Sequence, residues 1–381
     1  MPSALSRWEP PFQMRPEDLH VDPDIRRAST LPPEFYHDPE WFARTRDRVL
    51  SSGWHLIADH DRVRVPGQCF PFTLLEGVLD EPLLLTRDQD DRLRCLSNVC
   101  THRGMLVCEG ERNQTSLRCR YHGRRFGLDG RFLSMPEFAG VENFPSASDD
   151  LAPVPVATWN RFVFVSLAPA MPFETLAAEV QARLGWLPFD RMALDPSRSR
   201  DYLVRAHWAL YLDNYLEGFH VPYVHAGLTD TIDFARYRTE TFASGSVQVA
   251  PAAAGEPALE PPAGSPDHGQ RIAAYYFWLF PTTMFNVYPW GISVNVVKPL
   301  APDRTRVAFL AYVWDEALLE RGAGASLDRV EREDESVVEA VQAGVRGRFY
   351  RRGRYSPAQE AGVHHFHRLL AEHLRTSSPG R

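Results

Sequence analysis

The sequence predicts an α+β protein with a small all-β domain followed by a larger domain in which helices pack on an antiparallel sheet. The chain has 381 residues, more than one ordinary hydrophobic core accommodates. Residues 54–134 alternate short apolar runs with Pro, Gly, Asp and Asn, a pattern typical of β-hairpins. After residue 165 amphipathic helices and longer apolar strands follow. We therefore expect an N-terminal segment at 1–47 that packs on the larger domain, a β-domain at 48–162 and the larger domain at 163–381.

The composition and charge exclude several function classes. The 42 Lys and Arg against 49 Asp and Glu give a formal charge of −7, which argues against a nucleic-acid partner. The start MPSALSRWEPPFQ contains no apolar stretch of a signal peptide, and no apolar run reaches the length of a membrane span. Five cysteines in a chain of this size suit the cytoplasm, where clustered Cys and His bind metal more often than they form disulfides. We expect a cytoplasmic protein without membrane or nucleic-acid contacts.

The expected elements follow one another along the chain. A Pro-rich start leads into a helix over 41–52 that ends before Gly53, and Asp129-Gly130 predicts a hairpin turn in the β-domain. Amphipathic patterns predict helices at 172–187, 205–228 and 326–347. The Ala, Pro and Gly-rich segment 249–268 predicts a mobile loop or lid, and 273–314 predicts three antiparallel strands.

Two Cys-His pairs stand out in the β-domain. Cys100-x-His102 and Cys119-x-x-His122 each place one cysteine and one histidine on a short loop, and a glycine follows each pair. This ligand set can hold tetrahedral zinc, or a 2Fe–2S cluster in which histidines replace cysteines on one iron. Zinc fingers pair Cys with Cys and His with His, whereas here each loop can serve both irons. The pattern therefore favours the cluster over structural zinc.

A second polar group lies at 212–225. It contains five side chains that can bind metal or exchange protons: Asp213, Asn214, Glu217, His220 and His225. On one continuous helix Asp213, Glu217 and His220 share a face, and a bend at Pro222 can bring His225 back toward His220. Two histidines and one carboxylate are typical of oxygen-activating Fe(II) sites. Taken alone, the pair is more often an ordinary surface or core pair than a ligand set.

The motifs CTHRG and CRYHG resemble the Rieske iron–sulfur motif. Together with 212–225 they make nearly the whole chain similar to the α subunit of Rieske-type ring-hydroxylating oxygenases. This resemblance implies a Rieske domain that holds a 2Fe–2S cluster on Cys100, His102, Cys119 and His122. It also implies a helix-grip catalytic domain that carries a mononuclear iron.

The resemblance assigns roles at the second site as well. It implies that His220 and His225 bind the iron and that Asp334, in EREDESVVEAVQAG, supplies the third ligand, with Glu333 as the alternative. Glu217 matches an acidic residue, usually Asp, between the iron and the cluster of a neighbouring subunit. Glu217 and Asn214 are the candidate catalytic residues.

The resemblance implies an oxygenase that hydroxylates a small organic substrate with O₂ and two electrons. No G-x-G-x-x-G motif follows a strand, so a separate NAD(P)H-dependent reductase, with or without a ferredoxin, is expected. A homotrimer is implied, in which His122 faces Glu217 and His220 of the next chain. Two alternatives remain open: an aromatic-ring or natural-product hydroxylase of the same family, and a Rieske electron-transfer or ligand-binding protein without mononuclear iron.

The later sequence is most similar to the choline monooxygenase branch, through VYPWGISVNVVKPLAPDRTRV, EDESVVEAVQAGV and RGRYS followed by HHFH. That branch implies a quaternary amine, changed by methyl hydroxylation or oxidative demethylation. A quaternary ammonium group is well bound by aromatic rings. The candidates for such a pocket are Tyr276, Trp278, Phe285, Tyr288 and Trp290, although aromatic strand faces more often belong to a core.

Overall fold

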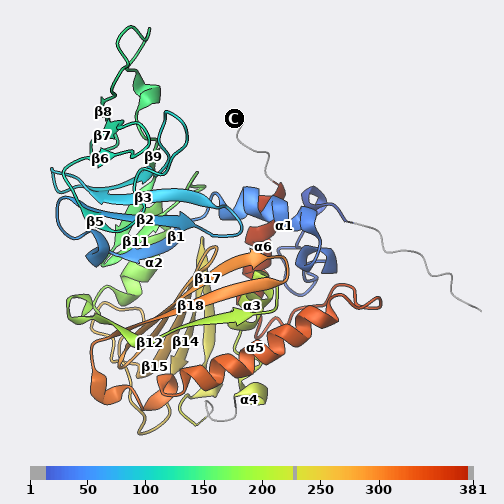
Figure 1. Cartoon of the computed structure of the whole chain (residues 1–381). Helices are drawn as coiled ribbons and strands as arrows, with labels where there is room; N and C mark the ends of the chain where they lie inside the picture. The colour runs from blue at the N-terminus through green and yellow to red at the C-terminus, as the bar shows by residue number, and fades with distance from the viewer. Residues whose placement is uncertain (1–13, 226–229, 376–381) are drawn as a thin grey trace, which may run out of the picture.

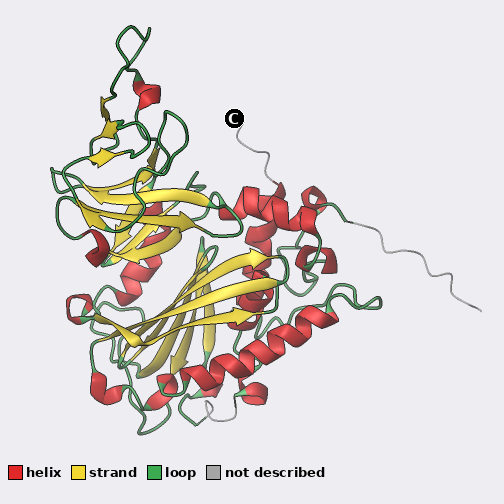
Figure 2. Ribbon diagram, viewed as in Figure 1, coloured by secondary structure: helices red, strands yellow, loops and turns green. Residues whose placement is uncertain are grey.

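A computed structural model of the chain describes residues 14–225 and 230–375. It confirms the α+β class, with a small β-domain standing on a larger domain of helices and antiparallel strands (Figures 1 and 2). In the described part of the chain, no helix is long and apolar enough to cross a membrane.

The small domain contains three antiparallel sheets. The five-stranded sheet has the order β5-β2-β3-β4-β9, and two three-stranded sheets have the orders β1-β11-β10 and β6-β7-β8. The strands are β1 His55–Asp59, β2 Gln68–Leu74, β3 Glu81–Arg87, β4 Leu93–Ser97, β5 Arg112–Asn113, β6 Leu117–Arg118, β7 Arg125–Phe126, β8 Phe132–Ser134, β9 Pro153–Val154, β10 Val156–Trp159 and β11 Phe162–Val165.

Strand β3 is buried on both faces, and its alternating side chains serve two cores. Leu83 and Leu85 join the core between the sheets, whereas Leu84 points into the core beneath the two Cys-His loops. The cysteines Cys100 and Cys119 belong to this second core. The loops are therefore supported from below by packed side chains.

The larger domain is built on a seven-stranded antiparallel sheet of order β12-β18-β17-β16-β15-β14-β13. Its strands are β12 Ala193–Val204, β13 Arg238–Phe242, β14 Gly245–Pro251, β15 Ile272–Leu279, β16 Thr283–Tyr288, β17 Gly291–Ala301 and β18 Arg304–Val313. Its helices are α2 Phe173–Leu184, α3 Trp208–Tyr215, α4 Val221–Val224, α5 Leu327–Gly344 and α6 Ala361–Arg375. Figure 1 shows α5 running along the lower edge of the sheet beside α4.

The two faces of this sheet have different partners because strand side chains alternate. On one face Phe277 and Phe285 form an opposed pair and pack with Phe162 of the small domain. On the other face Trp278 packs against Phe366 of α6. One face thus joins the domains and packs against α2, and the other carries α3, α5, α6 and the polar site described below.

The N-terminal segment packs on the helix face of the larger domain. It contains helix α1 Pro39–Thr45 and the short turns η1 Pro16–Asp18, η2 Pro33–Tyr36 and η3 Arg46–Leu50. Leu31 and Phe35 are buried in the core that includes α3 and α6. Arg352 and Arg354, from the Arg-rich stretch 347–355, donate to backbone carbonyls of Thr30 and Ala28 and so fix this segment.

The strand prediction for 273–314 is wrong in number, because the region forms four strands rather than three. An additional turn at 289–290 separates β16 from β17. The lid prediction for 249–268 is also wrong at both ends. Residues 249–251 belong to β14, and Asp267 is fully buried, where it pairs with Arg183 and accepts from the hydroxyl of Tyr275.

Helix α6 was absent from the prediction. Its pattern of Val363, Phe366, Leu370 and Leu374 follows the spacing of one helix face, and all four side chains are buried. The remaining short turns are η4 His60–Val63, η5 Ala147–Asp149, η6 Phe189–Arg191, η7 Phe234–Arg236, η8 Glu316–Leu318 and η9 Gly322–Gly324.

Candidate metal centres and active site

The two Cys-His loops of the small domain have the same backbone hydrogen-bond pattern. In each, the N–H of a glycine donates to the carbonyl of the cysteine four residues earlier, over 3.0 Å, for Gly104 to Cys100 and Gly123 to Cys119. Both glycines have positive φ, +71° and +76°, which other residues adopt only with strain. The two loops are thus matching tight turns that present their side chains toward one another.

The four predicted cluster ligands lie on these two neighbouring loops of the small domain. Cys100 and Cys119 are buried, with 3% and 2% exposure, whereas the ring of His122 reaches the surface. The Nδ1 atoms of His102 and His122 are 3.1 Å apart. Two nitrogens about 2.1 Å from one metal ion are separated by about this distance when the angle between them is near 95°. The residues present therefore fit a cluster held by thiolates inside and imidazole Nδ1 atoms outside.

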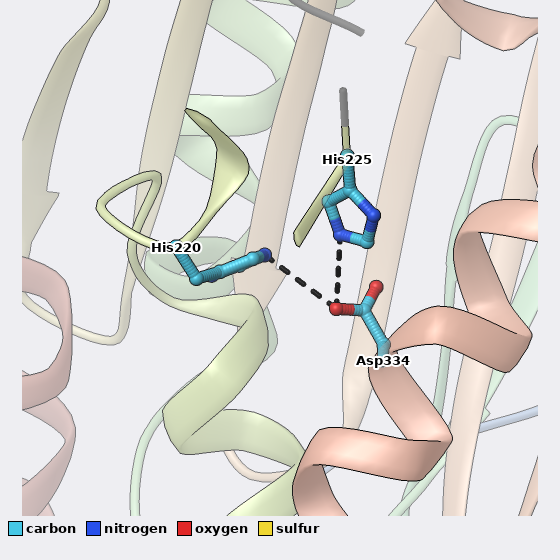
Figure 3. A group of neighbouring side chains, drawn as sticks. All are labelled: His220, His225 and Asp334. Atoms are coloured by element: carbon cyan, nitrogen blue, oxygen red, sulfur yellow. Dashed lines mark hydrogen bonds and ion pairs between the residues drawn. The ribbon is translucent and has the colours of Figure 1, made fainter. Parts of the chain in front are cut away.

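A second group of possible metal ligands lies on the helix face of the large sheet. His220, His225 and Asp334 offer ligand atoms that all lie within 4.8 Å of one another. The Nε2 atom of His225 is 3.0 Å from Asp334 Oδ1, and the Nε2 atom of His220 is 3.5 Å from the same oxygen. Figure 3 shows both rings directed at the carboxylate of Asp334. Ligands about 2.1 Å from one ion have separations of about 3.0–3.4 Å. The His225 pair has this spacing and the His220 pair lies just beyond it, so a small side-chain movement would let the three residues hold a single metal ion.

Each of the two histidines has a carboxylate on its other ring nitrogen. The Nδ1 atom of His220 lies 2.6 Å from Glu217 Oε1, and the Nδ1 atom of His225 lies 2.8 Å from Glu333 Oε2. Carboxylates in this position fix the tautomer of a metal-binding imidazole and raise its basicity. Glu333, the alternative third ligand, therefore lies on the side of His225 that faces away from Asp334.

Burial and the neighbouring carboxylates shift the pKa of His225 in opposite directions. Burial alone lowers the pKa of His225, but the hydrogen bonds and charges of Asp334 and Glu333 outweigh it and raise the pKa above its usual value. The same hydrogen bond from His225, with one from Arg329, lowers the pKa of Glu333. The site is thus strongly anionic, as a cation site requires.

The expectation that Asp213, Glu217 and His220 share one helix face is wrong. Helix α3 ends at Tyr215, because the Glu217 carboxylate accepts the backbone N–H of His220 at 3.0 Å and so replaces a helical hydrogen bond. A short helix α4 then begins at Val221 and returns His225 to His220, with ring centroids 5.2 Å apart.

Asp213 belongs to a buried structural network on the opposite side of α3. Its two carboxylate oxygens accept from the Tyr36 hydroxyl at 2.9 Å and contact His367 Nε2 at 2.7 Å. His367 Nδ1 in turn lies 2.6 Å from the Tyr355 hydroxyl. This network joins the N-terminal segment, α3 and α6.

A cavity of about 90 Å³ opens beside the His220, His225 and Asp334 group. Its walls carry five tyrosines: Tyr211, Tyr215, Tyr237, Tyr276 and Tyr288. They also carry four amides, Asn214, Gln248, Asn286 and Asn295, and three carboxyl groups, Glu217, Glu331 and Asp334. Among the described lining residues there is no lysine or arginine.

Of the five residues predicted for an aromatic pocket, the structure places two in the cavity wall and three elsewhere. Tyr276 and Tyr288 line the cavity, but Phe285 projects from the opposite sheet face toward the small domain. Trp278 is on the cavity face but is covered by Phe366 of α6. Trp290 stacks behind Tyr288 with ring centroids 5.4 Å apart and borders a neighbouring cavity.

Sequence reasoning missed several lining residues. The most unusual is Glu331, which is 4% exposed on α5, one turn before Asp334. Burial raises the pKa of the Glu331 carboxyl well above its usual range, and the charge of Asp334 adds to this effect although the Tyr211 hydrogen bond opposes it. The only signal in the sequence was its i, i+3 spacing to Asp334 on an acidic helix.

The comparisons with known proteins agree with this architecture. The family model for the Rieske [2Fe-2S] domain matches residues 53–145, and the model for the ring-hydroxylating alpha subunit (catalytic domain) matches residues 189–376. The choline monooxygenase of Arabidopsis thaliana is 31% identical over 93% of this chain and 85% of the relative. The chain belongs to the Rieske oxygenase family. The predicted cofactors, a Rieske 2Fe–2S cluster and a mononuclear iron, are those that these two domains imply.

Other relatives of this Rieske oxygenase each cover more than nine tenths of its length. The carnitine monooxygenase oxygenase subunit of Escherichia coli K12 is 28% identical over 97% of this chain and 99% of the relative. A solved quaternary ammonium Rieske monooxygenase in complex with L-carnitine has a TM-score of 0.73 at 23% identity, covering 93% of this chain and 99% of that chain. Naphthalene 1,2-dioxygenase from Rhodococcus, bound to indole, has a TM-score of 0.72 at 18% identity, covering 92% and 95%. The solved structures show the shared fold.

The predicted domain boundaries enclose both matched regions. The oxygenase prediction is confirmed, and the alternative of an electron carrier without a catalytic iron domain is not supported by the match to the catalytic domain.

Proposed function

We propose that this Rieske oxygenase hydroxylates a C–H bond of a small quaternary ammonium compound. In this reaction the C–H bond, O₂, two electrons and two protons yield a C–OH group and water. The observation that carries the proposal is the cavity wall, which combines tyrosine rings and carboxyl groups with no lysine or arginine among its described residues. Aromatic faces and anionic groups attract a cation of this kind. Relatives named choline and carnitine monooxygenases support the same substrate class.

The tyrosine-rich wall is held in place by its own hydrogen bonds. The Tyr237 hydroxyl donates to Gln248 Oε1 at 2.9 Å, and Gln248 Nε2 donates to the Tyr215 carbonyl at 2.6 Å. The Tyr215 hydroxyl donates to Asn286 Oδ1 at 2.6 Å. Because these polar groups satisfy one another, the rings are fixed before substrate arrives, which lowers the entropic cost of binding.

At the mononuclear centre we propose His220, His225 and Asp334 as the iron ligands, with Glu217 and Glu333 orienting the imidazoles. Two histidines and one carboxylate leave coordination positions for O₂ beside the substrate, and the bound iron supplies the oxygen activation. Asn214 lines the same cavity and has no hydrogen-bond partner among the described residues, so it is free to position the substrate.

For electron supply we propose an external reductase and a homotrimer. Strands β6 and β7, which flank the Cys119-His122 loop, lie in the part of the small domain away from the larger domain, whereas α4 lies at the far end of the larger domain (Figure 1). Both sites have exposed apolar neighbours: Tyr121, 56% exposed, stacks on His122, and Tyr223, 82% exposed, follows His220. Head-to-tail contact between such surfaces generates a ring. A solved relative is described as using inter-subunit electron transfer, which supports this arrangement.

The first experiment is to count iron and acid-labile sulfide in anaerobically purified protein. We expect three irons and two sulfides per chain, and two irons after His220→Ala with the sulfide unchanged. Two irons in both proteins would exclude a mononuclear site and, with it, the oxygenase mechanism.

The second experiment tests electron transfer between subunits. His102→Ala removes a cluster ligand and His220→Ala removes an iron ligand, so each variant alone should be inactive. Co-expressed in equal amounts, they should form mixed rings with about a quarter of wild-type activity, since one neighbouring pair in four combines an intact cluster with an intact iron. Inactive mixed rings, with wild-type protein active under the same conditions, would contradict transfer between chains.

A further inference from the structure

Glu331 is the cavity residue whose chemistry the oxygenase mechanism does not use. It projects from α5 and lines the cavity together with Asp334, the proposed iron ligand one turn later. Its Oε2 atom accepts a hydrogen bond from the Tyr211 hydroxyl at 2.8 Å. Its Oε1 atom is buried and has no hydrogen-bond partner among the described residues.

A buried carboxyl group with only one of its two oxygens hydrogen-bonded lowers the stability of a fold. Burial raises the pKa of this carboxyl group and so favours its neutral form, whereas a positive charge beside it would favour the carboxylate. No salt bridge of Glu331 occurs within the described chain, and its Oε1 atom has no partner there. A neutral residue of similar size would satisfy Tyr211 equally well. The missing partner is therefore a cation that the cavity itself receives.

We propose that Glu331 is the specificity-determining residue of the cavity and that its carboxylate pairs with the ammonium group of the substrate. This inference rests on the proposed function. The tyrosine rings surround the cation, and Glu331 supplies the charge that distinguishes it from a neutral molecule of the same shape. Substrate recognition is thus separate from the iron ligands, although Glu331 and the ligand Asp334 are both on α5.

The same argument narrows the substrate class. A cavity of about 90 Å³ has room for about six to nine water-sized groups at about 10–15 Å³ each, close to the size of choline. Arg198 and Arg200 lie in a neighbouring cavity, beyond the wall formed by Phe309 and Leu327. A substrate carboxylate would therefore meet no guanidinium or ammonium group among the described residues of the iron cavity. The occupant is a quaternary ammonium compound with a neutral tail.

A purely structural role for Glu331 as the partner of Tyr211 makes a different prediction. In that case the loss of its charge would change the packing of α3 against α5 and affect every ligand equally. Selective loss of the cation, with a neutral ligand of the same shape unaffected, distinguishes the two roles.

The test is anaerobic isothermal titration calorimetry on the iron-loaded full-length protein, with choline and its neutral isostere 3,3-dimethylbutan-1-ol as probes. Wild type should bind choline about tenfold or more tightly than the isostere. Glu331→Gln should abolish this preference and leave the isostere affinity within about threefold, while Glu331→Asp should retain part of it. Iron content and the unfolding temperature establish that each variant is folded.

Asp328→Asn is the matched control. Asp328 lies on the same helix one turn before Glu331 and accepts from a tyrosine hydroxyl, Tyr202 at 2.8 Å, but it borders the neighbouring cavity. Its loss of charge should leave both affinities unchanged. A similar effect of Asp328→Asn and Glu331→Gln would reduce the result to the general charge of α5 and overturn the inference.

The outcomes separate this inference from the proposed function. If wild type binds choline no better than the isostere, both the cationic substrate class and the role of Glu331 are wrong, whatever the variants do. If wild type prefers choline and Glu331→Gln keeps the full preference, the substrate class stands and the role of Glu331 is wrong.

Discussion

The carboxylates Glu333 and Asp334 are adjacent in sequence but have different proposed roles, which makes them the sharpest test of the iron site. Asp334 Oδ1 lies 3.0 Å from His225 Nε2, and Glu333 Oε2 lies 2.8 Å from Nδ1 of the same ring. Asp334→Asn removes an anionic ligand, whereas Glu333→Gln keeps an acceptor in place and removes only its charge. We expect the first change to abolish iron binding and the second to weaken it.

The size of the Glu333 effect follows from its surroundings. A carboxylate that orients a metal-binding histidine contributes about 10–100-fold to metal affinity. The side chain of Glu333 is 30% exposed, and its Oε1 atom forms an ion pair with Arg329 Nε at 3.0 Å. Solvent and this ion pair therefore weaken the electrostatic effect of Glu333 on His225. We therefore expect the lower limit, about tenfold or about 1.4 kcal/mol in the free energy of iron binding.

The measurement is anaerobic competition for Fe(II) between the iron-free site and a chelator of known affinity. Glu335→Gln on the same helix, which has no hydrogen bond to either histidine among the described residues, is the control and should change the affinity less than about twofold. Equal loss of iron in Glu333→Gln and Asp334→Asn would refute the assignment of ligand and orienting residue. Unchanged affinity in Glu333→Gln would show that the Nδ1 contact contributes nothing.

Three further predictions concern stability and the cluster loops. Asp213→Ala leaves the buried Tyr36 hydroxyl and His367 imidazole without their acceptor, and we expect about 3 kcal/mol less resistance to urea unfolding; a loss under about 1 kcal/mol would show that the network is unimportant. Burial lowers the pKa of His207 to about 3, so the unfolded chain binds the extra proton below about pH 6.5 and stability should fall by about 1.4 kcal/mol per pH unit as the pH decreases. The urea midpoint between pH 7 and pH 5 measures this effect, and a flat profile would contradict it. Gly104→Ala meets no neighbouring atom, so only its φ of +71° resists the methyl group. We expect about 1 kcal/mol lower stability with the 2Fe–2S absorbance retained, and complete loss of the cluster would show that the turn tolerates no strain.

The cluster motif was predictable from sequence because its parts are local. Each Cys-His pair is contained within four residues, and the glycine after each pair marks the turn that the structure contains. The iron site is less local, since Asp334 is 109 positions after His225. Sequence spacing could not choose between Asp334 and Glu333, and the family resemblance made that choice.

Other features depended on contacts that no pattern along the chain records. The helix expected over 205–228 stops after Tyr215, because the Glu217 side chain takes the backbone N–H that a continuing helix would use. The prediction that Phe285 lines the aromatic pocket was wrong, because Phe285 lies opposite Phe277 in the sheet and its side chain therefore points to the domain junction. Register within the sheet is set by pairing, which the composition of one strand does not reveal.

Side chains alternate between the two faces of the large sheet, and this affects how the enzyme can acquire new substrates. Odd-numbered positions such as Phe277 and Phe285 join the domains, while the even-numbered Tyr276 and Asn286 border the cavity. New substrates can therefore be accommodated by exchanging every second residue on β15 and β16, without altering the surface that supports the electron-carrying domain. A directed library restricted to these positions would vary the substrate cavity while the contact with the Rieske domain, which delivers the electrons, stays the same.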